Sequence, residues 1–494
     1  MWMQSAAGLR RLGAAGSLAM AVGGTAAGTL PAREPWGLWV PYGPATTLAA
    51  AVLAYAGLTV LVLAWWAYQH QEEHGPRDAL VTLAWWTAPL LLAPPLYSAD
   101  VYSYIAQGAM VLEGHDVYAH GPSVLGPHSL GADAAAGVGG NWTDTPAPYG
   151  PVFLLLAKAV VWATGGAIVP AVAGMRLLAV GALALIVWAV RRLAVECGAS
   201  ESRALWLAAL NPLLLMHVVG GMHNDGLMIG LMLTGVVCAL SGRWLLGSAV
   251  VALAIMVKSP AAVALLFIGV IVMRAGRDGR GPLILRAAKA FVVPGLVAAA
   301  VAAGSTVLGG TGFGWLRTQS VAATIHTPLS LTSDIGLAAG HLARLVAGTD
   351  PAAVKALVQS LGLAAALVVI GFLAYRSLRG RLHPVPALGL SLLALVALSP
   401  MVQPWYLLWG MATVAAAMAW RGRTAQVLMV LSVALVYETQ PSGHTPPYGF
   451  VLGAVAALLA VTALRRHPAP PASGPRPRIP AQSTAPAGTP VPRS

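Results

Sequence analysis

Long apolar runs separated by short polar stretches dominate this chain. A membrane-spanning helix needs about 20 predominantly apolar residues, and the strict alternation typical of a transmembrane β-strand is missing from these runs. The pattern therefore predicts an all-α polytopic membrane protein with about 14 transmembrane helices, whose backbone polar groups are satisfied within each helix. The predicted spans are 12–30, 44–68, 79–97, 171–190, 204–221, 226–241, 243–257, 261–274, 287–309, 351–373, 385–400, 404–420, 424–440 and 448–464.

One apolar run, GPVFLLLAKAVVWATGGAIVP at 150–170, is left out of these spans because of the basic residues that follow it. If it crossed the membrane, Arg191, Arg192 and the later basic loops would face outward, against the positive-inside rule. We therefore expect this run to lie on the outer surface. The outer side then keeps only a few basic residues, namely Arg33, Lys158, Arg176, Lys258, Arg317, Arg344 and Lys355.

The composition supports the membrane interpretation and changes the meaning of the charge. The chain is 57% hydrophobic and 9% charged, whereas a soluble domain has roughly 25% charged residues. The net charge of +13 would suggest nucleic acid as the partner of a soluble protein. Here the arginines are topology signals in cytoplasmic loops, so the expected partner is the lipid bilayer of the plasma membrane and not a nucleic acid.

The same patterns divide the chain. Residues 1–464 are predicted to form one transmembrane domain, in which 98–170 is an outer catalytic loop followed by the surface segment. Residues 465–494 are rich in Pro, Ala and Ser and are predicted to be a disordered cytoplasmic tail. The glycine-rich GGTGFG stretch at 309–314 lacks the strand that a nucleotide-binding loop follows, and we expect no cofactor.

Most of the conspicuous polar residues fall on the outer side. The sharpest case is Asp100, the first acidic residue after the apolar run that ends near 97, at the start of a stretch with helical spacing. An aspartate there can be a helix N-cap. At the mouth of an outer cleft it can also be a general base that takes a proton from an acceptor hydroxyl.

Lys258 is the second notable charge. It lies between apolar residues in LAIMVKSPAAVALLF and belongs to no basic loop. A charged group in such a place is costly unless it is paired or functional. It either snorkels to the membrane interface or binds a lipid phosphate.

Two further outer turns carry polar and aromatic residues. His223, Asn224 and Asp225 suggest part of a metal site, but a third ligand is missing and Asn-Asp-Gly is also ordinary turn chemistry. Trp405 and Tyr406, in SPMVQPWYLLW at 399–409, suit either an interfacial aromatic belt or contact with a sugar. We expect no metal at this site.

The order of these motifs resembles a known family. SADVYSYIAQG begins at residue 98, and PYGPV, HNDG, KSP and QPWYLLW follow it along the chain. In this order they resemble the polyprenol-phosphate-mannose-dependent α-1,6-mannosyltransferases of actinobacteria, which belong to the GT-C class of membrane glycosyltransferases. The resemblance covers roughly residues 40–465, with SADVYSY and HNDG as its most specific parts.

The resemblance implies transfer of mannose from polyprenyl-phosphate mannose to an α-1,6-mannan on a phosphatidylinositol mannoside or lipomannan acceptor, on the outer face of the membrane. Asp100 is the expected base of an inverting displacement. Lys258, with Arg317 and His326, is expected to stabilise the carrier phosphate. The sugars are expected to contact a set of outer polar and aromatic residues, namely Tyr102, Tyr104, Gln107, Tyr149, His223, Asn224, Asp225, Gln403, Trp405 and Tyr406.

Other functions stay open at this point. A GT-C enzyme for another lipid-linked sugar, such as arabinose or glucose, would use the same chemistry in a differently shaped pocket. A transporter or flippase for a lipid-linked sugar predicts inverted repeats and polar residues at mid-membrane, and the chain shows neither clearly. A glycan polymerase or ligase fits if Asp100 is dispensable. The sequence does not separate an enzyme that primes the mannan from one that extends it.

Overall fold

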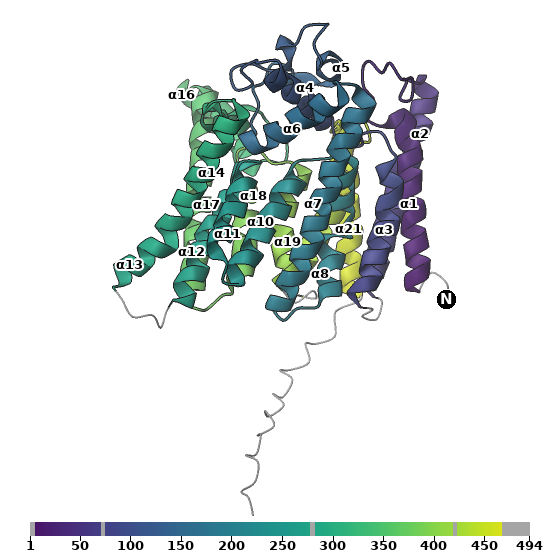
Figure 1. Cartoon of the computed structure of the whole chain (residues 1–494). Coiled ribbons are helices and arrows are strands. Elements are labelled where there is room, and N and C mark those ends of the chain that lie inside the picture. The colour runs from purple at the N-terminus through teal and green to yellow at the C-terminus, as the bar shows by residue number, and fades with distance from the viewer. Residues whose placement is uncertain (1–4, 71–74, 277–281, 418–421, 467–494) are drawn as a thin grey trace, which may run out of the picture.

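The computed structural model describes residues 5–70, 75–276, 282–417 and 422–466. These residues form helices and connecting loops without any strand, as predicted. Most of the helices stand side by side in one bundle, and a layer of shorter helices covers one end of it (Figure 1). The last helix extends to Arg466, so the rest of the predicted tail lies outside the described residues.

Each predicted span contains at least one helix, but several of these helices are shorter than a membrane span requires. By length and apolar character, five described segments suffice to cross a membrane, and one bent pair also qualifies. The five are Pro44–Tyr68, Ile168–Glu196, Leu283–Gly309, Pro351–Leu378 and Pro447–Arg466. The other apolar helices are shorter, so the number of 14 crossings is not confirmed. The bundle helices are α1 (Ala6–Ala27), α2 (Pro44–Tyr68), α3 (Pro76–Leu91), α7 (Ile168–Glu196), α10 (Asp225–Leu240), α11 (Trp244–Ile255), α12 (Val263–Ala275), α14 (Val293–Gly309), α17 (Pro351–Leu378), α18 (Pro384–Ala397), α19 (Leu407–Ala417), α20 (Arg423–Leu435) and α21 (Pro447–Arg466).

The covering layer contains α4 (Asp100–Leu112), α5 (Ala132–Gly137) and α6 (Pro151–Thr164). Helix α6 is the apolar run that we expected not to cross. It has 14 residues, as few as several bundle helices, but it lies in the layer that covers one end of the bundle and not among the helices that stand side by side (Figure 1). Helices α4 and α6 touch at Gly108, where a Cβ atom would lie 2.6 Å from the backbone of Ala157.

The bent pair brings a bundle helix to the covering layer. Helix α8 (Glu201–Ala208) and the segment Pro212–Gly220, which is α9 (Pro212–Leu214) continued by a π-helical turn, meet at an angle of 50°. Proline cannot continue the hydrogen bonding of a helix. Asn211 fills the break, since its Oδ1 accepts from the Leu213 amide and its Nδ2 donates to Ser432 Oγ. The chain then enters the turn that carries His223 to Asp225.

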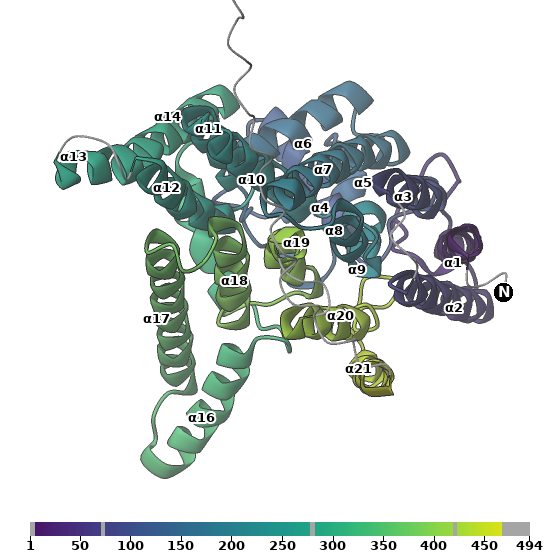
Figure 2. The same cartoon turned by 90° about the horizontal axis from the view of Figure 1, so that it is seen from below.

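One helix was not predicted. Helix α16 (Leu331–Ala347) lies where only an outer loop was expected, and it projects sideways from the bundle beside α17 (Figure 2). Its start is fixed to the loop after α18: Ser330 Oγ and Ser333 Oγ donate to the carbonyls of Ser399 and Pro400. This helix therefore anchors the loop that leads to Gln403.

Candidate active site

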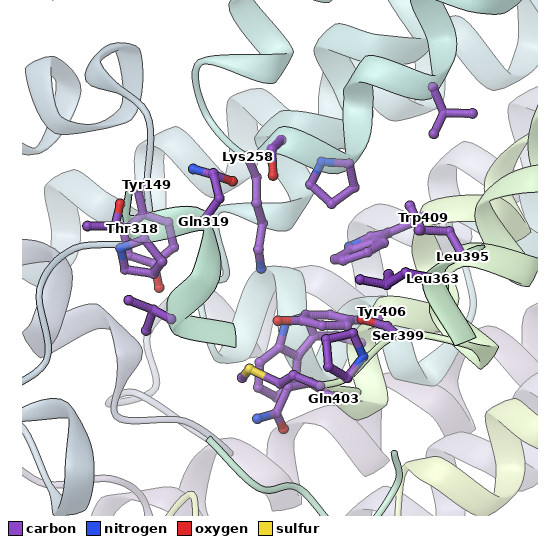
Figure 3. A pocket seen from close by; sticks show the side chains of 18 of the residues that line it. Tyr149, Lys258, Thr318, Gln319, Leu363, Leu395, Ser399, Gln403, Tyr406 and Trp409 are labelled. Atoms are coloured by element: carbon purple, nitrogen blue, oxygen red, sulfur yellow. The ribbon is translucent and has the colours of Figure 1, made fainter. Parts of the chain in front are cut away.

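A cavity of about 400 Å³ opens beneath the covering layer. Its polar part is lined by Asp100 and by Lys258, Gln403 and the rings of Tyr149 and Tyr406, which are labelled in Figure 3. Its other wall is apolar and comes from α12, α17 and α18. That wall contains Val263, Leu363, Leu367, Ile370 and Leu395.

The backbone that leads to Asp100 is unusual. Tyr97 adopts a left-handed conformation with φ of 64°, and its amide donates to the carbonyl of Pro441. Arg176 on α7 donates to the carbonyls of Leu91, Ala93 and Pro94, just before this segment. A non-glycine residue at positive φ costs about 1–3 kcal/mol, so the surrounding contacts hold the chain in a shape that it would not adopt alone.

Asp100 is the first residue of α4, and its carboxylate is directed to side chains. Its Oδ2 lies 3.1 Å from His223 Nδ1 and accepts from the Tyr104 hydroxyl at 3.3 Å. The side chain is 27% exposed. Its own amide donates to Ser98 Oγ. Within the described residues no backbone amide donates to the Asp100 carboxylate, so the helix-cap explanation does not account for its position.

His223 is held against an aromatic wall. Its side chain is fully buried, and its ring stacks on Trp405 with 3.7 Å between the centroids. The preceding residue, Met222, is the second non-glycine residue at positive φ, with φ of 54°. Burial alone would raise the pKa of Asp100, but the nearby His223 and Lys258 keep that pKa below its ordinary value. Asp100 is therefore ionised at neutral pH.

Lys258 forms a buried ion pair with Asp225. Its Nζ lies 2.9 Å from both carboxylate oxygens, and the indole Nε1 groups of Trp405 and Trp409 donate to the same carboxylate at 3.1 and 2.6 Å. The amine also lies 4.6 Å from the centre of the Tyr406 ring. Burial would lower the pKa of Lys258, but Asp225 raises it above its ordinary value. A lysine that is paired inside a pocket is not a snorkelling lysine.

The structure gathers most, but not all, of the predicted site residues. Asp225 supports Lys258 with both oxygens, so its contact with a sugar stays a prediction. The sugar contact of Asn224 also stays a prediction, because its buried side-chain amide has no partner among the described residues. Two other predicted residues bond elsewhere: Tyr102 donates to the Thr29 carbonyl and Gln107 donates to Ser103. The predicted residues in or around the pocket are Asp100, Tyr104, Tyr149, His223, Asp225, Lys258, Gln403, Trp405 and Tyr406.

The two additional phosphate-binding candidates do not reach the cavity. Its lining includes Thr318 and Gln319 but not their neighbour Arg317. His326 lies 2.8 Å from Asp334 at the start of α16 and is exposed. Among the described residues, no group of three His, Cys, Asp or Glu side chains could hold a metal ion. His223 and Asp225 therefore gain no third ligand.

The sequence analysis missed Trp409 and the apolar wall. Trp409 follows Trp405 by four residues, a spacing that places both side chains on one face of a helix, and this spacing could have indicated a shared partner. The leucines of α17 and α18 carried no such signal, because nothing distinguishes them from other apolar residues of a span.

The chain matches two family descriptions. Residues 10–274 match "Alpha-(1->6)-mannopyranosyltransferase, N-terminal domain", and residues 332–466 match "MptB C-terminal domain". The chain belongs to the α-(1→6)-mannopyranosyltransferase family. The first match contains Asp100, His223 and Lys258, and the second contains Gln403 and Trp405, so the polar part of the pocket is built by both.

Curated relatives agree with this membership over almost the whole chain. A probable α-(1→6)-mannopyranosyltransferase of Mycolicibacterium smegmatis is 36% identical over 96% of this chain and 91% of the relative. An α-(1→6)-mannopyranosyltransferase of Mycobacterium tuberculosis is 35% identical over 92% of this chain and 86% of its own length. Corynebacterium glutamicum α-(1→6)-mannopyranosyltransferase B is 31% identical over 93% and 82%. As a member of this family, the protein is a glycosyltransferase that transfers mannose, and its apolar helices indicate a membrane protein.

Proposed function

We propose that this protein transfers mannose from polyprenyl-phosphate mannose to an α-1,6-mannan acceptor of lipomannan and lipoarabinomannan, with Asp100 as general base and inversion at the anomeric carbon. The observation that carries the proposal is the composition of one cavity. An ionised carboxylate and a lysine ammonium share its polar part, and its other wall is apolar. A lipid-linked sugar phosphate needs these three features together.

Asp100 is proposed to activate the acceptor. The 6-hydroxyl oxygen attacks the anomeric carbon of mannose, the bond from that carbon to the phosphate oxygen breaks, and the hydroxyl proton moves to Asp100. His223 and Tyr104 both contact Oδ2, so we assign the proton transfer to Oδ1. One displacement of this kind converts a β-linked donor into an α-linked product.

Lys258 is proposed to stabilise the leaving group. Negative charge grows on the phosphate as the bond breaks, and a fixed cation at that place lowers the barrier. Asp225 and its two indole donors hold the ammonium group in position. Because phosphate is already a good leaving group, the reaction needs no strong general acid.

The apolar wall is proposed to receive the start of the polyprenyl tail. Leu363 and Leu367 of α17 and Leu395 of α18 line the same cavity as Asp100. Leu367 is 67% exposed, which indicates that this side of the cavity opens outward between helices. In a bilayer that opening would face hydrocarbon, so a lipid-linked donor could enter sideways.

Aromatic groups and one amide are proposed to hold the sugars. The rings of Tyr149, Trp405 and Tyr406 line the polar part of the cavity, and Gln403 lies beside them. Aromatic rings offer flat apolar surfaces for sugar faces, whereas the Gln403 amide can both donate and accept hydrogen bonds with sugar hydroxyls.

The site is proposed to face the outside of the plasma membrane. The covering layer with Asp100 lies at one end of the bundle, and α8, α13 (Leu283–Ala287) and the start of α1 lie at the other (Figure 1). Arg10 near the N-terminus, Arg203 of α8 and Arg286 of α13 belong to that second end. By the positive-inside rule this distribution favours a cytoplasmic position for the second end.

A reconstituted assay tests the proposal. Purified protein in liposomes would receive polyprenyl-phosphate mannose carrying a radiolabel, together with short α-1,6-mannosides as acceptors. We expect an acceptor lengthened by one α-1,6-linked mannose, and no product from the corresponding arabinose or glucose donors. Transfer of another sugar would refute the donor assignment. Movement of the labelled lipid across the bilayer without any transfer would indicate a flippase instead.

A further inference from the structure

A second cavity lies at the opposite end of the bundle from Asp100. It has a volume of about 570 Å³ and lies between the start of α11, the end of α12 and α13 with the π-helical turn that follows it. Figure 1 shows α13 at the end of the bundle remote from α4. Its lining includes Trp244, Ile271, Leu285, Arg286 and Lys289. None of these residues belongs to the transfer pocket.

The cavity contains two cations that have no acidic partner among the residues that the structure describes. Neither Arg286 nor Lys289 forms an ion pair within the described residues, and Arg286 Nε is a buried donor that no described atom accepts from. A buried N–H group without an acceptor is rare in folded proteins. Lys289 Nζ lies 5.8 Å from the centre of the Trp244 ring. Arg286 and Lys289 both line the cavity, so the two cations face the same space.

A helix start also borders this space. Helix α11 has 12 residues and begins at Trp244, and no side chain caps its first amides. Uncapped amides at a helix N-terminus favour anions through their N–H groups and the helix dipole. The ends of α10 and α12 also line the cavity and carry the opposite partial charge. The feature that suits a phosphate group is therefore the guanidinium of Arg286 together with the ammonium of Lys289.

The walls of the cavity suit a lipid. Leu285 lines it, and the neighbouring Leu283 and Ile284 are 66% and 76% exposed on the same short helix. A π-helical turn at Ala288–Val292 follows, and Phe291 in that turn packs so closely on Gly269 that a Cβ atom there would lie 2.3 Å from its ring. Exposed apolar side chains beside two neighbouring cations are typical of a site for a lipid head group between membrane helices.

We propose that this cavity binds the phosphate of an anionic phospholipid in the leaflet opposite the transfer pocket. Arg286 and Lys289 would hold the phosphate oxygens beside the start of α11, and the acyl chains would run along Leu283 and Leu285. A soluble phosphate compound would use the same cations but would leave these apolar side chains uncovered. The proposal does not depend on which sugar the enzyme transfers.

The test compares variants of the purified full-length protein. Phosphatidylglycerol would be added in detergent, and the bound fraction measured by native mass spectrometry, with phosphatidylcholine as the neutral comparison. We expect each of Arg286→Gln and Lys289→Gln to weaken phosphatidylglycerol binding about fivefold, and the double variant about 25-fold. The charge-preserving double variant, Arg286→Lys with Lys289→Arg, should bind within about threefold of the parent.

A matched control removes a charge of the same kind elsewhere. Arg192 lies near the end of α7, on the same side of the bundle. It is exposed and lies outside the cavity, so Arg192→Gln should leave binding unchanged. Equal loss in Arg192→Gln would mean that only the general positive charge attracts the lipid, and the cavity would be rejected. Full competition by soluble glycerol phosphate would assign the cations to a soluble ligand and overturn the lipid proposal.

Discussion

Replacing Asp100 by Asn tests the proposed base with little disturbance of its surroundings. The amide keeps the size of the side chain and still offers an oxygen to the Tyr104 hydroxyl and to His223 Nδ1, which contact Oδ2 in the parent. The start of α4 is secured by Ser98, whose Oγ accepts from the amide of residue 100. The variant should therefore fold and bind the donor, but it has no carboxylate to take the proton.

The expected effect on turnover is large. General-base help contributes about 10²–10⁴-fold to a rate, which corresponds to about 2.7–5.5 kcal/mol in the activation barrier. Stability should change little, because the Asp100 side chain is partly exposed and forms no ion pair with an arginine or lysine in the described part of the chain. Loss of activity without loss of folding is therefore the specific prediction.

The assay measures kcat and KM for mannose transfer in liposomes, with circular dichroism and thermal unfolding as tests of folding. Asp116→Asn is a matched control, since Asp116 lies in the same outer region and its Oδ1 accepts only from amides of its own turn. We expect kcat to fall at least about 100-fold for Asp100→Asn and to stay near the parent value for Asp116→Asn. Near-normal turnover of a folded Asp100→Asn protein would refute the assignment.

Four further predictions address the rest of the site and the topology. Lys258→Ala should raise the donor KM about 10- to 100-fold, because a charged hydrogen bond is worth about 1.5–3 kcal/mol, and should also lower kcat, because the lost cation stabilises charge that grows in the transition state. Lys258→Arg should restore part of both, and an unchanged KM together with an unchanged kcat would exclude the phosphate role. His223→Phe should raise the pKa of Asp100, because His223 is the main group that opposes the effect of burial on that pKa. The fall of kcat/KM toward low pH should then begin at a higher pH. His223→Asn keeps a hydrogen-bond donor and should shift the profile less, and an unmoved profile would remove His223 from this role. Leu367→Gln should raise the KM about fivefold for a long polyprenyl donor but not for a short-chain analogue, measured side by side; equal effects on both would argue against the apolar wall as the tail site. In intact cells and in a background without the native cysteines, Glu196→Cys should resist an impermeant thiol reagent while Ser123→Cys reacts, and labelling of the first would invert the proposed topology.

The sequence alone determined the class of the protein and its two most informative charges. Long apolar runs with few charges permit only membrane helices, because backbone groups in lipid must bond within their own segment. In such a chain an isolated Asp100 or Lys258 stands out, since a charge beside hydrocarbon is costly without a partner or a function. The basic loops also predicted that 150–170 stays at one surface. This stays a prediction, and it agrees with the place of α6 in the layer that covers one end of the bundle.

Only the tertiary structure decided which of these groups are partners. Asp100 contacts His223, and Lys258 contacts Asp225, although the partners are far apart in the sequence. A local sequence pattern does not specify which distant residues come into contact. The resemblance placed both Gln107 and Tyr104 among the sugar contacts. Each bonds one turn back within α4, Gln107 to Ser103 and Tyr104 to Asp100, and only the tertiary structure shows that Asp100 lines the cavity. The apolar wall shows the same limit: Leu367 of α17 and Leu395 of α18 look like any other apolar residue of a span, and only the packing of those helices beside α12 brings them to one cavity.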